Sequence, residues 1–72
     1  MRPAELQMFL DERDMTQKAL AELLGVTPQT PMRWLAGSWP VPITTGLLLR
    51  LLEGNHVSLA RVAEMRRLYE PD

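Results

Sequence analysis

The stretch that most limits the fold of this chain is residues 16–37, where two short helical patterns flank a single tight turn. Thr16 is a good N-cap, and apolar side chains recur at helical spacing over residues 20–24. Gly25 can adopt the left-handed backbone conformation that ends a helix without a steric penalty. Residues 17–24 are therefore predicted to form a helix that ends in a turn.

A second helix is expected directly after this turn. Thr27 is placed to cap it, and Pro28 suits the first helical position, where a missing N–H has no partner to lose. Apolar residues between positions 32 and 35 continue the helical pattern, and Gly37 ends it. The second helix is therefore predicted over residues 28–36.

This pair of helices resembles the helix-turn-helix of the Cro/Xre family of prokaryotic and phage repressors. The resemblance covers about a third of the chain. It implies an all-α fold, the five-helix lambda-repressor-like helix-turn-helix domain, and double-stranded DNA as the partner. The residues that carry it are Thr16-Gln17, Leu20-Ala21, Leu24-Gly25-Val26, Thr30, Arg33-Trp34 and Gly37.

The rest of the chain is expected to complete one domain, residues 1–72, with further helices over residues 3–13, 43–53 and 59–69. The sequence has no cysteine, so neither disulfides nor a thiolate metal site can stabilise it. No apolar run approaches a membrane span, and the start of the chain lacks a secretory signal. We therefore expect a cytoplasmic protein that is stabilised by helix packing.

Leucines between positions 47 and 52 point around more than one face of the expected fourth helix. A small core needs only one apolar stripe, so this surplus predicts a second apolar contact. A single domain of this kind reads a short half-site, and two copies read a palindrome. We therefore expect a homodimer formed through the C-terminal helices, with Val57, Leu59, Val62 and Tyr69 at the interface.

The residues expected to contact DNA follow from helix-turn-helix geometry, in which the second helix presents its outer face to the major groove. Trp34 and the residue three before it must point inward. Gln29, Met32 and Arg33 are then left as base-reading candidates, because Gln can bridge adenine and Arg can bridge guanine. The residues expected to contact the DNA backbone are Thr16, Gln17, Lys18, Thr27, Thr30 and Trp39.

Two residues depart from the family pattern. Pro31 stands where the family has Val or Ile, and it predicts either a late start or a loosened first turn for this helix. Trp39 stands in a loop that often carries Lys or Arg. Its indole can donate to a phosphate, anchor a subunit interface, or pack over the core.

An enzyme is poorly supported by the sequence. His56 is the only histidine, and neither a nucleophile arrangement nor metal-ligand spacing accompanies it. We therefore expect no cofactor, no metal and no small-molecule substrate.

The favoured interpretation is a sequence-specific regulator, a small phage or mobile-element repressor that binds a palindromic operator. The net charge of −1 counts against nonspecific binding of polyanions. Together with Pro31, it favours the alternative, a protein-interaction module of the antitoxin-like or adaptor type on the same fold.

Overall fold

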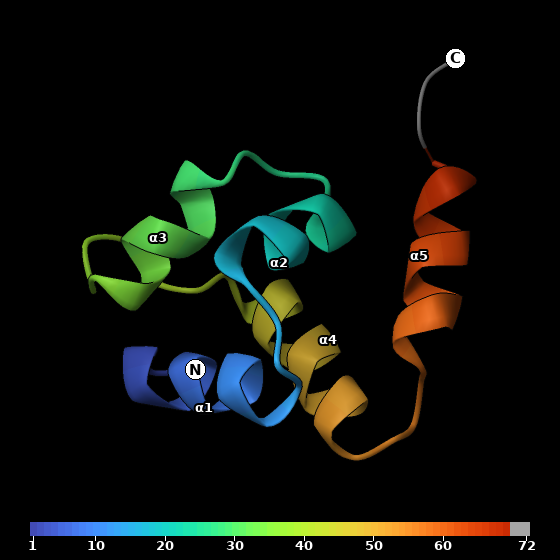
Figure 1. The fold of residues 1–72 in the computed structure, drawn as a ribbon, viewed down its shortest axis with the longest axis horizontal. Coiled ribbons are helices and arrows are strands. Elements are labelled where there is room, and N and C mark those ends of the chain that lie inside the picture. The colour runs from blue at the N-terminus through green and yellow to red at the C-terminus, as the bar shows by residue number, and fades with distance from the viewer. Residues whose placement is uncertain (70–72) are drawn as a thin grey trace.

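The computed structural model describes residues 1–69, which form five helices and no strand (Figure 1). The all-α prediction is therefore confirmed over this part of the chain, and residues 70–72 of the expected domain lie outside it. Within it, no helix has both the length and the apolar character needed to cross a membrane. The helices are α1 (Pro3–Glu12), α2 (Gln17–Leu24), α3 (Gln29–Leu35), α4 (Ile43–Glu53) and α5 (Leu59–Arg67).

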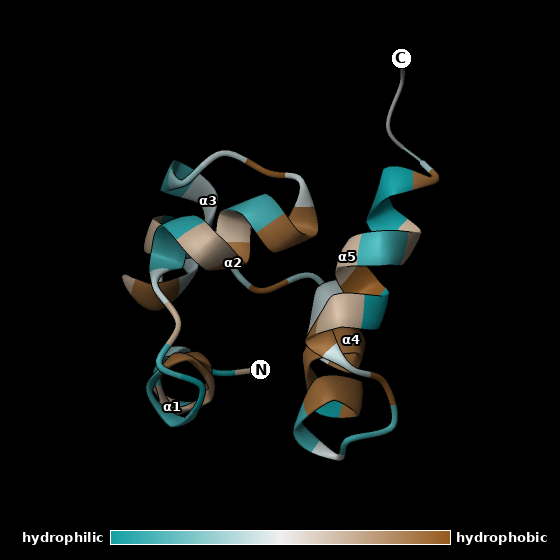
Figure 2. Cartoon of the chain, turned by 45° about the vertical axis from the view of Figure 1, so that its right-hand side comes forward, coloured by the Kyte–Doolittle hydropathy of each residue, from teal (hydrophilic) through white to brown (hydrophobic). Residues whose placement is uncertain are grey.

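A single hydrophobic core receives side chains from all five helices. Helix α2 packs against α3 and α5, and α3 also packs against α1. Helices α1 and α5 lie at opposite sides of the molecule (Figure 1, Figure 2), so the core runs between them. Leu6, Phe9 and Leu10 form the buried stripe of α1. The core cluster consists of Leu6, Phe9, Leu10, Leu20, Trp34, Leu49, Leu52 and Val62.

The first helix of the predicted pair has the ends that its sequence indicates. The Thr16 hydroxyl accepts a hydrogen bond from the Ala19 N–H at 3.0 Å, so Thr16 caps α2. Gly25 has a φ of +76°, and its N–H donates to the carbonyl of Ala21 at 2.9 Å. The left-handed glycine thus ends α2 and turns the chain toward α3.

The start of α3 differs from the expectation. Pro28 occupies the N-cap position in place of Thr27, and in the described part of the chain no side chain caps this helix. The Thr27 hydroxyl instead lies 3.3 Å from the Thr30 hydroxyl. Because α3 begins at Gln29, Pro31 falls in its first turn, where an N–H would have no intrahelical acceptor. Helix α3 thus begins one residue later than expected and contains Pro31, whose ring is buried.

An ion pair between two residues that are far apart in the sequence, Glu5 and Arg50, joins α1 to α4. The Glu5 carboxylate accepts a hydrogen bond from the Arg50 guanidinium, and it also accepts one from the Arg2 N–H at 3.3 Å. Arg50 donates as well to Glu53, at 3.2 Å. The Arg50 hydrogen bond, followed by the Arg2 one, lowers the pKa of Glu5 below its ordinary value of 4.5.

This shift predicts a loss of stability in acid. A carboxylate whose pKa is lower in the folded state stabilises the fold above its unfolded pKa, and that stability is lost as the pH falls through the folded pKa. The melting temperature of the wild type should therefore fall as the pH is lowered through and below 4.5. The melting temperature of Glu5→Gln should fall less steeply with decreasing pH, as measured by thermal melts followed by circular dichroism.

Glu64→Gln is the matched control for the pH series. Glu64 is exposed and pairs with Arg61 of its own helix, at 3.3 Å, so it joins no two helices. This variant should keep the wild-type pH dependence. Parallel curves for Glu5→Gln and the wild type would show that the α1–α4 pair does not contribute.

Candidate nucleic-acid interface

The outer face of α3 carries the three residues that were predicted to read bases. Pro31 and Trp34 are buried on the inner face, which confirms the expected orientation of this helix. Gln29 and Met32 are exposed, and Arg33 is partly exposed. The structure therefore brings these three side chains to one accessible surface of the helix.

Arg33 is held against Trp39 in the loop that follows α3. The carboxy-terminal turn of α3 passes through Gly37, whose φ is +77°. The Arg33 carbonyl then accepts hydrogen bonds from the Ser38 and Trp39 N–H groups, at 3.0 and 3.3 Å. The guanidinium carbon lies 4.6 Å from the centroid of the indole, which is 49% exposed. This is the geometry of a cation–π contact.

No carboxylate within residues 1–69 neutralises Arg33. Its Nε is enclosed without a hydrogen-bond partner, the one such side-chain polar atom in this part of the chain. The two terminal Nη groups are not enclosed in this way. A ligand with hydrogen-bond acceptors can therefore reach the far end of this side chain.

The amino-terminal end of α2, the helix that precedes α3, is a second part of the candidate interface. Gln17 and Lys18 are exposed there, and the Thr16 hydroxyl is already engaged as the cap. The N–H groups of a first helical turn have no intrahelical acceptors, which favours a bound anion. From residue 16 to residue 39 the chain carries two cations, Lys18 and Arg33, and one carboxylate, Glu22. The local charge is thus weakly positive although that of the whole chain is not.

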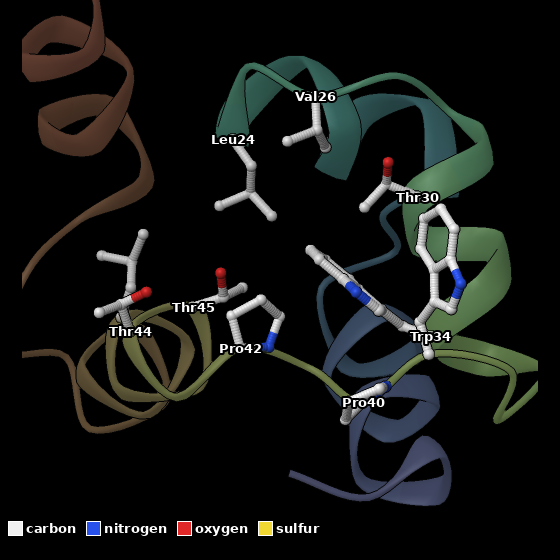
Figure 3. A pocket seen from close by; sticks show the side chains of 10 residues that line it. Leu24, Val26, Thr30, Trp34, Pro40, Pro42, Thr44 and Thr45 are labelled. Carbon is white, nitrogen blue, oxygen red and sulfur yellow. The ribbon is translucent and has the colours of Figure 1, made fainter.

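A cavity of about 650 Å³ opens beside α3 (Figure 3). Leu24 and Val26 border it from the end of α2 and the turn, and Trp34 borders it from α3. None of the residues that line it within positions 1–69 is charged. Trp39 also lines the cavity, so this residue borders the cavity and contacts Arg33. The remaining lining residues are Thr30, Pro40, Pro42, Thr44, Thr45 and Leu48.

No family model, curated protein or solved structure matches this chain. Any assignment of function therefore depends on the chemistry of the surfaces that its own helices present.

The expected dimer residues are divided by the structure between core and surface. Val62 is 9% exposed and belongs to the core, and Val57 and Leu59 are partly buried against it. Tyr69, in contrast, is 83% exposed. Three of the four expected interface residues therefore pack in large part within their own chain.

Two further exposed residues lie at this surface: Leu51 of α4, which belongs to the leucine surplus expected to make a second apolar contact, and Met65 of α5, which was not among the expected interface residues. With Tyr69 they line a groove of about 300 Å³ between the two helices. The remaining lining residues are Leu48, Val57, Val62 and Arg66. The i, i+3 spacing of Leu48 and Leu51, which both line the groove, was the available signal, because it places them on one side of α4.

Proposed function

We propose that this chain is a sequence-specific DNA-binding transcriptional regulator, a small repressor with a lambda-repressor-like helix-turn-helix that binds its operator as a homodimer. The observation that carries the proposal is the un-neutralised Arg33 on the outer face of α3, beside the exposed Gln29 and Met32. The capped start of α2, its left-handed Gly25 and the inward Trp34 support the fold assignment.

In this proposal α3 enters the major groove. The Arg33 guanidinium donates to guanine, the Gln29 amide pairs with adenine, and the Met32 side chain contacts apolar base edges. The exposed start of α2 approaches a phosphate, with Gln17 and Lys18 supplying donors and charge. Thr27, just before α3, and Thr30, in its first turn, are assigned contacts with the sugar–phosphate backbone.

The test is selection of binding sequences from a random DNA pool by the purified protein. We expect an inverted repeat whose half-sites are centred about 34–36 Å apart. Affinity for the selected site should fall with salt along a shallow slope, because few cations are available to displace counterions. If no sequence is enriched even at low salt, the proposal is wrong.

The second candidate is a protein-interaction module on the same fold, with weak or no DNA binding. The exposed apolar surface of α4 favours it, since Ile43 and Leu47 lie outside the core. The formal net charge of −1 favours it as well. A chain that fails the DNA selection but retains a specific protein partner would support this candidate.

Dimer formation is tested by Met65→Asp in the groove between α4 and α5. Met65 is exposed and outside the core cluster, so its replacement should leave the monomer helical. A symmetric contact meets the new charge twice, so the dimer should dissociate. Sedimentation at micromolar concentration should show a dimeric wild type and a monomeric variant, and the variant should bind the operator more weakly.

Ala60→Asp is the control for this variant, because it adds the same charge to an exposed position of α5 that does not line the groove. It should remain dimeric. Val57→Asp and Leu59→Asp are unsuitable, because both side chains are partly buried against the core. A wild type that stays monomeric both free and on its operator would contradict the dimer.

A further inference from the structure

We propose that Trp39 is a positioning residue for Arg33. Its indole holds the guanidinium in the orientation in which the arginine contacts the edge of its base pair. This inference rests on the proposed function and assigns Trp39 a part in it. The sequence left three roles open for Trp39: donation to a phosphate, an interface anchor and core packing. The structure instead places the indole against the guanidinium, 4.6 Å from the ring centroid to the guanidinium carbon.

The backbone of the turn that follows α3 places Trp39 next to Arg33. Gly37 permits the left-handed step that reverses the chain, and the two hydrogen bonds to the Arg33 carbonyl fix residue 39 beside residue 33. The indole therefore approaches Arg33 because the loop geometry brings it there. A freely rotating tryptophan would not give the arginine a fixed platform.

A second arginine in the chain shows what a purely structural stack looks like. Arg13 lies over the Phe9 ring, with its guanidinium carbon 4.2 Å from the centroid. Its terminal nitrogens donate to the carbonyls of Phe9 and Leu52, at 3.4 and 3.3 Å, and so join the end of α1 to the end of α4. The donors of Arg13 are thus used inside the protein.

Arg33 has the same kind of stack but none of these internal bonds. Within residues 1–69 it has neither an ion pair nor a side-chain hydrogen bond, and its Nε is enclosed. Hydrogen bonds to a ligand must then come from the two terminal Nη groups, which approach a pair of acceptors end-on. The O6 and N7 atoms of guanine present such a pair in the major groove. A guanidinium already fixed in its plane loses less freedom on binding.

The decisive experiment compares Trp39→Leu with Trp39→Phe on the selected operator and on operators changed at single base pairs. Cation–π contacts of this strength predict that Trp39→Leu lowers the preference at the base pair read by Arg33 by about two- to thirtyfold. Trp39→Phe should keep most of the preference, because a flat ring remains. Adding Trp39→Leu to Arg33→Ala should cause no further loss of preference.

A measurement without DNA separates this inference from the proposed function. In NMR spectra of the free protein, the Arg33 side-chain protons should show ring-current shifts that disappear in Trp39→Leu, while those of Arg13 stay unchanged. Unaltered Arg33 shifts in that variant would overturn the inference. It would also be overturned if Trp39→Leu weakened binding equally on every operator, because this is the pattern of a phosphate contact.

The failure of each proposal has its own signature. If the wild type selects an operator and Trp39→Leu keeps the same base preference, only the positioning role of Trp39 is wrong. If the wild type shows the Arg33 ring-current shift but binds DNA without sequence preference, the proposed function is wrong, and the positioning role is wrong with it.

Discussion

Replacing Leu20 with alanine is expected to lower the free energy of unfolding by about 2–5 kcal/mol. Leu20 lies in the middle of α2, is 0% exposed and belongs to the core cluster. A chain of 72 residues has a total stability of only about 4–11 kcal/mol. The variant should therefore show a large shift of the urea midpoint, or be partly unfolded without denaturant.

Leu47→Ala is the matched control, since it makes the same substitution in a helix at a residue that is 61% exposed. Its effect should stay within about 0.5 kcal/mol. Leu24→Ala should fall between the two, because Leu24 is only partly buried and borders the cavity beside α3. Equal losses for Leu20→Ala and Leu47→Ala would mean that α2 does not face the core as described.

Arg33→Ala is expected to cost about 1–3 kcal/mol of operator binding, and to relax the preference at a single base pair. The alanine removes both terminal Nη donors from the outer face of α3. Arg33→Lys should also lose the preference while keeping the charge, because an ammonium group cannot make the planar bidentate contact. Titration of base-substituted operators gives both numbers.

Arg61→Ala controls for the loss of one positive charge. Arg61 is exposed on α5, where it pairs with Glu64 of the same helix at 3.3 Å. Its removal should leave the base preference unchanged, whatever its small effect on affinity. If Arg33→Ala also weakened binding equally on every sequence, Arg33 would be reassigned to a phosphate contact.

The sequence predicted the bounds of α2 and α4 and the start of α5 because these helix ends are set by local chemistry. Thr16 and Ser58 each place a side-chain oxygen where the first turn of a helix has unsatisfied N–H groups. Gly25 and Gly37 adopt the left-handed conformation that most residues with a side chain disfavour. These preferences depend on a few neighbouring residues, so they can be read without knowing the fold.

The sequence predicted the orientation of α3 for a related reason. Helix-turn-helix geometry implies that Trp34 and the residue three before it lie on the inward face, and the structure buries both. The accessible side of Gln29, Met32 and Arg33 follows from that face alone. The residues proposed to read DNA could thus be named before the structure was known, although their function stays a prediction.

Only the tertiary structure decided which apolar residues of α4 and α5 are covered. Val62 and Met65 are one helical turn apart on α5, yet Val62 belongs to the core and Met65 is exposed. The contact of Trp39 with Arg33 and the pair between Glu5 and Arg50 depend in the same way on the path of the chain. Side-chain spacing defines the faces of a helix, but burial depends on which helices pack against each face. That choice depends on the packing of all five helices together, so local patterns do not contain it.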